Sequence, residues 1–298
     1  MIEREICGVL PVNKPAGMTS HDVVFKIRKL YGTKKVGHTG TLDPDATGLL
    51  IVLIGRAAKA AEYVVAGKKV YRAGLRLGVT TDTEDTTGKI LTESDDIPEK
   101  SRVLEAIASF KGESLQVPPM YSALKVNGQK LCDLARKGIT VEREARPITV
   151  YEISADGEGR DYTMEVACSA GTYIRTLCAD IGAKLGCGGA MSSLFRTETG
   201  GFDISSAHTL EEIDSLSQDE RDALLIPTEN LFASLPSVTL PAFYERLAKN
   251  GAEIYQKKIG AHFPVGTLLR VCGGEGFFGL GEVREYEDGS AVKIVKFL

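Results

Sequence analysis

Residues 36–50 read VGHTGTLDPDATGLL. Glycines, threonines and an Asp-Pro pair fill its first half, and the apolar run LLIVLI follows at 49–54. This pattern predicts a tight polar loop that leads into a buried strand. Proline fixes its own φ and keeps the preceding residue out of the helical region, so the Asp43 carboxylate sits on a backbone with little freedom. Asp43 is a candidate for chemistry, although an Asp beside Pro and Gly also commonly serves only to turn a loop.

Helical and alternating patterns surround this loop and predict an α+β fold. Thr19 or Ser20 is placed to cap a helix before the loop, and GTYIRTLCADIGAKLG predicts a second helix that Gly186 ends. Alternating strands are predicted at 70–79, 148–154 and 161–169. Because strands and helices mix without regular β-α-β alternation, we expect a largely antiparallel mixed sheet flanked by helices.

Two segments differ from this core in amino-acid composition. Residues 113–147 hold many bases, one short helix and few large apolar side chains, which is typical of an inserted arm that closes on a ligand. Prolines punctuate 227–241, and short strands separated by glycines follow at 265–297. We therefore expect two domains, at 1–236 and 237–298, with the second small and β-rich.

The charge is segregated along the chain. The net charge is −4 over 298 residues, but 82–105 carries 8 acids against 3 bases and 203–229 carries 8 acids against 1 base. The remaining chain is therefore basic, at +8. Such segregation permits a basic face for phosphate despite the acidic total, although charge alone is equally consistent with ordinary solvated surfaces.

Several classes of protein are not supported. The N-terminus MIEREICGVL lacks an apolar signal-like region, and the longest uninterrupted aliphatic run has six residues, so neither export nor membrane spanning is expected. The six cysteines have neither CxxC nor His-paired spacing, which signals neither a zinc site nor a disulfide framework. No P-loop or dinucleotide fingerprint occurs. We expect a cytoplasmic protein without metal or cofactor.

Several short sequence motifs follow one another along residues 8–202. They are KPAGMTS, GHTGTLDPDATG, VYRAGLRLG, TDTEDTTG, PPMYSALKVNGQKL, GTYIRTL and LFRTETGGF. Together they resemble the bacterial TruB family of tRNA pseudouridine synthases, and several words in register are far more specific than one short motif. The resemblance implies the pseudouridine synthase fold and a C-terminal PUA or PUA-like RNA-binding domain. It also implies isomerisation of uridine 55 in the T loop of tRNA to pseudouridine after base flipping, without cofactor, metal or guide RNA.

The resemblance also implies roles for particular residues. Asp43 matches the catalytic aspartate, and Arg175 of GTYIR matches the arginine that pairs with it and favours its ionised form. Tyr71 matches a tyrosine that stacks on the target base and is a candidate proton acceptor, whereas strand alternation by itself places Tyr71 in the core. Whether the carboxylate adds covalently or moves a proton stays open.

Further residues are expected to hold the RNA. Tyr173 and Leu194 match residues that line the base pocket, and His38 matches a histidine that fills the gap left by the extruded uridine. Lys14 and Pro15 are expected to brace the active-site loop. In the arm, we expect the bases Lys130, Arg136 and Arg143 to contact RNA.

Two other functions stay compatible with parts of this pattern. One is an RNA-binding or tRNA-folding protein with the same fold and no catalysis, and the other is a guide-RNA-dependent pseudouridine synthase, which shares the GHTGTLDP-like loop. The presence of Asp43 with Arg175 disfavours the first, and the arm at 113–147 resembles the stand-alone form. The resemblance further implies a monomer that binds the T arm of tRNA.

Overall fold

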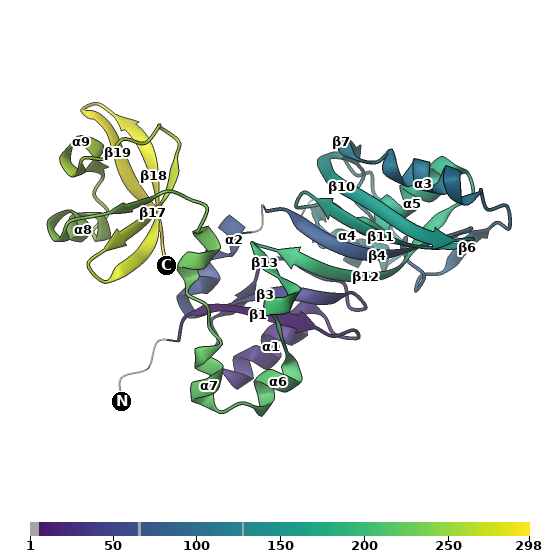
Figure 1. Ribbon diagram of the computed structural model, residues 1–298, viewed down its shortest axis with the longest axis horizontal. Coiled ribbons are helices and arrows are strands. Elements are labelled where there is room, and N and C mark those ends of the chain that lie inside the picture. Colours follow the sequence, from purple (N-terminus) through teal and green to yellow (C-terminus); the bar gives the residue numbers. More distant parts are fainter. Residues whose placement is uncertain (1–5, 65–66, 127) are drawn as a thin grey trace.

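A 10-stranded mixed sheet forms the body of the protein (Figure 1). The computed structural model describes residues 6–64, 67–126 and 128–298. Along the sheet the strands lie in the order β14 (His208–Thr209), β1 (Gly8–Lys14), β3 (Thr47–Ile54), β12 (Gly189–Thr199), β4 (Lys69–Leu77), β11 (Asp161–Cys168), β10 (Arg146–Glu158) and β7 (Gly112–Gln116). Two short strands lie off this path, with β2 (Val36–His38) paired to β3 and β13 (Phe202–Asp203) paired to β12.

The sheet is largely antiparallel, which confirms the predicted fold class. The parallel pairs are β1 with β14 and β3 with β12, while the other pairs along the sheet are antiparallel. In β3 the apolar run is buried on both faces. Leu50, Val52 and Ile54 pack under α1 (Ser20–Leu30), and the alternate residues pack toward η1 (Gly55–Ala60). A strand covered on both faces needs a continuous apolar run, which is why 49–54 does not alternate.

Helix ends follow the signals in the sequence. Thr19 caps α1 with a capping box to Asp22, and α5 (Ile174–Leu185) ends at Gly186 with φ 80°. Only glycine adopts that left-handed conformation without steric cost. Helix α5 and α3 (Lys100–Ala108) cover the face of the sheet formed by β4, β11 and β10.

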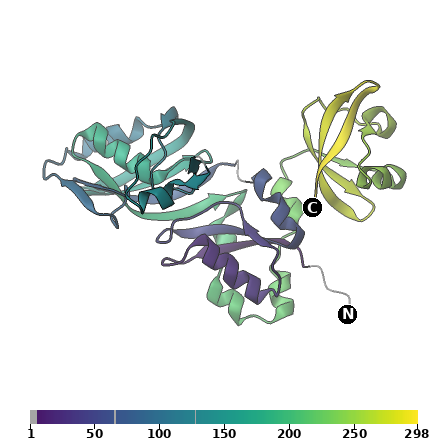
Figure 2. The ribbon, with the colours of Figure 1, turned by 180° about the vertical axis from the view of Figure 1, so that it is seen from behind.

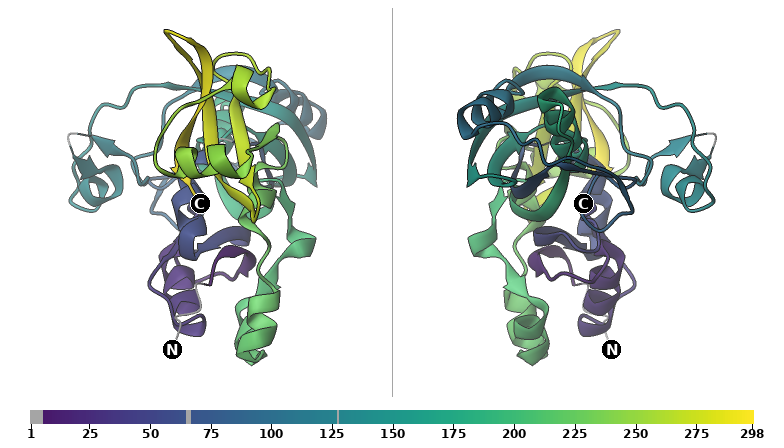
Figure 3. Two further views of the ribbon diagram at one scale, coloured as in Figure 1. Left: turned by 90° about the vertical axis from the view of Figure 1, so that its left-hand side faces the viewer. Right: turned by 90° about the vertical axis from the view of Figure 1, so that its right-hand side faces the viewer.

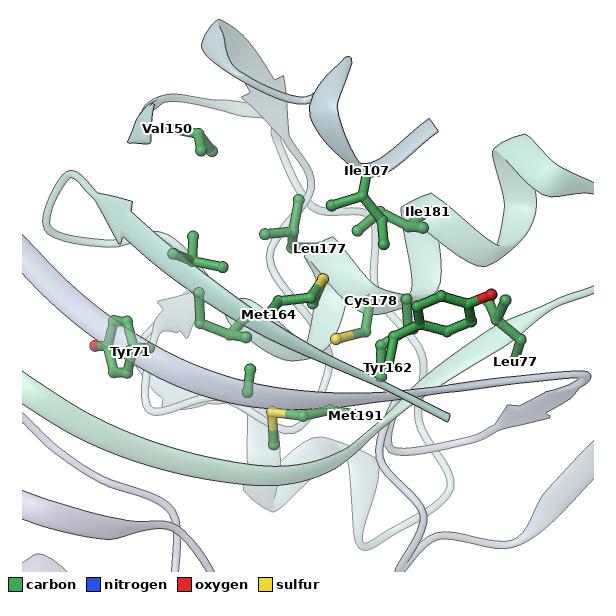
Figure 4. Close-up of a cluster of buried hydrophobic side chains, with 14 of the residues drawn as sticks. Tyr71, Leu77, Ile107, Val150, Tyr162, Met164, Leu177, Cys178, Ile181 and Met191 are labelled. Atoms are coloured by element: carbon green, nitrogen blue, oxygen red, sulfur yellow. The ribbon is translucent and has the colours of Figure 1, made fainter. Parts of the chain in front are cut away.

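The largest core cluster lies between this face and α5 (Figure 4). Met164, Leu177, Cys178 and Ile181 pack at its centre. Tyr71 lies at one end of the cluster, with its hydroxyl directed away from the other labelled side chains. The loop containing Asp43 packs on the same core, because Leu42 and Ala46 belong to this cluster.

The inserted segment is shorter than predicted. Residues 113–116 form most of β7 and residues 146–147 begin β10, and these strands pair within the main sheet. The part outside the sheet therefore spans 117–145. It holds β8 (Lys125–Val126), β9 (Gln129–Lys130) and α4 (Leu131–Ala135), and it projects from the body of the protein (Figure 3). We refer to residues 117–145 as the arm.

A separate sheet of five strands forms the C-terminal domain, which confirms the expected small β-rich domain (Figure 2). Its order is β15 (Ser237–Thr239), β17 (Leu268–Gly273), β18 (Gly276–Tyr286), β19 (Gly289–Phe297) and β16 (Ile254–Tyr255), with α8 (Ala242–Lys249) and α9 (Gln256–Ile259) beside it. Acidic helices α6 (Leu210–Ser215) and α7 (Gln218–Ala223) lie at the periphery, and η3 (Thr228–Phe232) leads into this domain. Leu280 and Leu298 pack with Phe232 and β3, so the two domains share one apolar cluster.

Among the described helices, none has the length and apolarity needed to cross a membrane.

Candidate active site

The loop that carries Asp43 is held from beneath by Lys14, the last residue of β1. The Lys14 ammonium is fully buried and donates to the carbonyl oxygens of Pro15, Pro44 and Ala46 at 2.9, 2.9 and 2.6 Å. Burial lowers the pKa of Lys14 to about 8. The side chain therefore braces the loop, as predicted, and has no face directed to a ligand.

Further contacts fix both sides of the same loop. The Ser20 hydroxyl donates to the Leu42 carbonyl at 3.1 Å and accepts from the Leu42 amide at 2.8 Å. The Gly17 amide donates to the Pro44 carbonyl, and the Ala46 amide donates back to the Asp43 carbonyl. The KPAGMTS segment thus supports the loop, and these hydrogen bonds restrict the backbone that positions Asp43.

Arg175 meets Asp43 with two nitrogens. Its Nε lies 2.9 Å from Asp43 Oδ2, and its Nη2 lies 3.4 Å from Oδ1. The guanidinium also donates to the carbonyl oxygens of Thr83 at 3.1 Å and Tyr121 at 2.7 Å. The Arg175 side chain is 6% exposed, whereas that of Asp43 is 42% exposed. A buried arginine therefore presents a carboxylate that solvent, or a substrate, still reaches.

Residues 81–88, TDTEDTTG, form a second side of the site around Asp43. Glu84 has φ 65°, which is rare for a residue other than glycine, and its carboxylate accepts from the Thr176 hydroxyl at 2.5 Å. Burial raises the pKa of Glu84. Asp85 accepts from the hydroxyls of Thr83 at 2.8 Å and Thr87 at 2.6 Å. These bonds hold the Thr83 carbonyl where Arg175 needs it.

An open cleft of about 520 Å³ lies above Asp43. Its lining brings together five predicted site residues, namely Asp43, Arg175, Leu194, Lys130 and Arg136. The body of the protein contributes the first three, and the arm contributes the two bases. The arm therefore forms one side of the same cleft that holds the carboxylate, although 87 residues separate Asp43 from Lys130 in sequence.

Tyr71 lies beside the cleft and does not line it. It is 7% exposed and belongs to the core cluster, which agrees with its alternation along β4. Burial raises the pKa of its phenol, and the nearby Arg196 opposes that shift. Arg196 is its register partner on β12. Tyr71 therefore combines core packing with a position at the edge of the site.

The other predicted site residues are not among those that line the cleft. His38 accepts from the Gly40 amide through Nδ1 at 3.3 Å, and burial lowers its pKa, so the neutral ring is favoured. Tyr173 caps α5, and its backbone exchanges two hydrogen bonds with the Gln116 side chain at 2.8 and 3.0 Å. Arg143 donates to the Pro118 carbonyl at 2.9 Å, so it fastens the arm to itself.

Arg196 is the principal residue that the sequence patterns did not reveal. It is 1% exposed, and it donates from Nε to the Leu49 carbonyl at 2.7 Å and from Nη2 to the Gly40 carbonyl at 3.2 Å. It joins β12 to the active-site loop. The only signal in the sequence is its place in LFRTETGGF, because a charged residue in an alternating strand usually faces solvent.

The sequence of the chain matches a known protein family. The model of the TruB family pseudouridylate synthase N-terminal domain matches residues 28–174, and that of the tRNA pseudouridylate synthase B C-terminal domain matches 175–233. The tRNA pseudouridine synthase B of Alkaliphilus oremlandii is 43% identical over 295 residues, which cover 98% of each chain. The chain belongs to the TruB family. The synthase B of Clostridium tetani is also 43% identical, over 98% of this chain and 99% of its own.

Solved structures of similar fold extend the comparison. The structure of a Cbf5-Nop10-Gar1 complex contains a chain that is 28% identical with a TM-score of 0.75, covering 98% of this chain and 85% of its own. An H/ACA RNP bound to a substrate RNA containing 2'-deoxyuridine contains one that is 27% identical with a TM-score of 0.74, covering 100% and 87%. As a TruB family member, the protein is a tRNA pseudouridine synthase, an isomerase that acts on tRNA.

Proposed function

We propose that the protein converts uridine 55 in the T loop of tRNA to pseudouridine, without a guide RNA. The observation that carries the proposal is the Asp43 carboxylate, held by Arg175 and open to a cleft that the arm helps to form. The relatives named tRNA pseudouridine synthase B match nearly the whole chain, including the arm. The arm offers a surface of the protein itself for gripping a folded RNA, which a guide would otherwise position.

The reaction is balanced without any other reactant. The glycosidic bond between uracil N1 and the sugar carbon breaks, the uracil turns, and uracil C5 bonds to that sugar carbon. The proton lost from C5 is balanced by the proton gained at N1, so the product has the same atoms as the substrate. Asp43 is the group we assign to this work, because it is the carboxylate that Arg175 holds at the floor of the cleft. It adds to the substrate or accepts a proton from the sugar, and both roles require the ionised form that an adjacent guanidinium favours.

The target base must leave the RNA stack to reach this carboxylate. Asp43 lines the same cleft as Lys130 and Arg136, and we propose that the target nucleotide enters this cleft from the loop of the RNA. Extrusion of a nucleotide costs a few kcal/mol and is cheapest in a loop. We assign Leu194 and Tyr173 to the pocket of the extruded base and His38 to the gap that it leaves.

Tyr71 is assigned to both stacking and proton transfer. Its ring belongs to the apolar cluster next to the site, which suits a base platform. Because burial raises its pKa, the phenol is protonated in the free protein at neutral pH. It therefore serves as an acceptor only when its own proton can pass to another group, and the positive charge of Arg196 favours that transfer.

The remaining RNA contacts are assigned to the arm and the C-terminal domain. Lys130 and Arg136 line the cleft, and the Arg136 side chain is 73% exposed. The domain of residues 237–298 is proposed as a PUA-like RNA-binding unit, appended to a catalytic domain of residues 1–236.

The test is incubation of the purified chain with an unmodified tRNA transcript and no guide RNA, followed by mapping of pseudouridine at single-nucleotide resolution. We expect one modified site, at position 55, and none in a transcript with cytidine there. Modification at another position, or a requirement for added guide RNA, would overturn the assignment.

A further inference from the structure

A second group of charges lies three residues before Asp43, around Gly40. A methyl group built on Gly40 would lie 3.5 Å from Arg196 Nη1 and 3.5 Å from Lys69 Nζ. Lys69 is the first residue of β4, and it shares a strand face with Tyr71, two residues later. Arg196 reaches the same place from β12. The two cations therefore converge on the side of Gly40 from which a Cβ atom would project.

No carboxylate neutralises this pair within the described ranges 6–64, 67–126 and 128–298. Neither Lys69 nor Arg196 takes part in an ion pair there, and Arg196 Nη1 is buried without a hydrogen-bond partner. Lys69 is half-buried, and its pKa is lowered first by burial and then by the charge of Arg196. Two like charges brought together out of water are costly unless an anion joins them.

The nearby carboxylate is committed elsewhere. Asp43 is engaged by Arg175, and burial and the charge of Arg196 lower the pKa of His38, which favours its neutral ring. The loop 38–43 thus has two different charge environments. At Asp43 a cation is paired with the carboxylate, and at Gly40 two cations lie next to a position that has no side chain.

We propose that Lys69, Arg196 and Gly40 form a subsite for the phosphodiester group that flanks the target uridine. Lys69 donates to a phosphate oxygen in front of Gly40, and Arg196, which solvent does not reach, adds its charge from beneath. RNA carries such an anion at every nucleotide, and this space adjoins both Asp43 and Tyr71, between which the target nucleotide must sit. This inference deepens the proposed function and rests on it.

The same phosphate contact explains a glycine at position 40. Its φ is not among the positive values that demand glycine, so alanine is compatible with the backbone. The added methyl would meet Arg196 and Lys69 only at ordinary van der Waals distance. Gly40→Ala should therefore fold normally, yet its methyl would occupy the space in front of both cations.

The first experiment measures binding of a tRNA transcript by five variants at several salt concentrations. Lys69→Gln should weaken binding roughly tenfold, since a hydrogen bond to a charged group is lost. It should also reduce the slope of log affinity against log salt by about one. Lys69→Arg should restore most of the affinity. Lys100→Gln, which removes an equal charge from the exposed Lys100–Asp156 pair, should leave binding near the parental value.

Gly40→Ala is compared with Gly37→Ala, whose methyl would meet only the Ala58 side chain at 3.8 Å. We expect unchanged melting temperatures for both and a loss of RNA affinity, roughly tenfold, for Gly40→Ala alone. If Lys69→Gln matches Lys100→Gln, or Gly40→Ala matches Gly37→Ala, the subsite does not exist.

The second experiment locates the phosphate. Synthetic T-arm RNAs carrying one neutral methylphosphonate at a time are bound to the parent and to Lys69→Gln. We expect one substitution beside the target uridine to weaken parental binding and to have little further effect on Lys69→Gln. Independent losses at every position would overturn the proposal. Because binding is the readout, the result stands apart from the mapping of the converted uridine, so failure of the phosphate contact and failure of the position assignment are distinguishable.

Discussion

Replacement of Arg175 by methionine tests whether the ion pair positions the carboxylate. In the structure the guanidinium donates to Asp43 Oδ1 at 3.4 Å and to the carbonyls of Thr83 and Tyr121, and its Nε forms an ion pair with Asp43 Oδ2 at 2.9 Å. Methionine keeps the apolar bulk of a side chain that is 6% exposed and removes the three hydrogen bonds and the ion pair. Three segments that are distant in sequence would then be without their common partner.

The expected loss of stability is modest. Each bond from a charged donor contributes about 1.5–3 kcal/mol, but removal of the buried guanidinium also removes a desolvation cost of several kcal/mol. Asp43, which is 42% exposed, regains water when the guanidinium is removed. We therefore expect the free energy of unfolding to fall by only about 1–2 kcal/mol.

Turnover should fall far more than stability. A displacement of about 1 Å at a reacting group costs on the order of 100-fold in rate, and loss of the fixed charge adds to it. We expect single-turnover conversion of saturating tRNA to fall by about 10²–10³-fold. Arg175→Lys should recover part of this loss, since one ammonium can hold Asp43 but cannot span both carbonyls.

Arg270→Met is the matched control. Arg270 also pairs with a carboxylate, Glu229 at 2.7 Å, and donates to a carbonyl, Leu235 at 3.1 Å, but it lies in the C-terminal domain. Its substitution should cost similar stability and leave the rate of the saturated enzyme near the parental value. A rate for Arg175→Met within tenfold of the parent would refute the positioning role.

Four further results are expected. Asp43→Asn keeps size and loses the charge, so single-turnover conversion should drop about 10⁴-fold or more with RNA binding retained; residual activity within tenfold of the parent, once deamidation is excluded, would remove Asp43 from the chemistry. Tyr71→Phe keeps the ring, and we expect severe loss of conversion with tRNA affinity intact; a parental rate, with only Tyr71→Leu impaired, would leave Tyr71 as a stacking platform. Lys130→Ala combined with Arg136→Ala should weaken tRNA binding and flatten its salt dependence by about 0.7–0.9 for each phosphate that the protein no longer neutralises, and an unchanged slope would place the RNA elsewhere. Because burial lowers the pKa of Lys14 from 10.5 to about 8, the folded protein binds fewer protons than the unfolded chain between these values. The parent should therefore gain about 3 kcal/mol of stability relative to Lys14→Met across this window, and parallel urea-unfolding profiles from about pH 7.5 to 10.5 would contradict it.

Local features of the fold were predictable because their causes lie within a few residues. The cap of α1 at Thr19 and the end of α5 at Gly186 follow from side chains and backbone freedom at those positions. The buried strand after Asp43 follows from an apolar run too long and too uniform for a half-exposed strand. The resemblance of several separate words to one family supplied the candidate residues, which periodicity did not.

The assembly of the site was decided by the tertiary structure. Asp43 and Arg175 are 132 residues apart, and they meet because β3, β12 and β4 lie side by side with α5 packed against the sheet. Strand order depends on the packing of whole layers, which no local pattern encodes. For the same reason the sequence predicted an arm but not that its bases share a cleft with Asp43. The buried Arg196 is the clearest case. Sequence patterns assigned it no role, and its partners on two other segments are evident only in the folded chain.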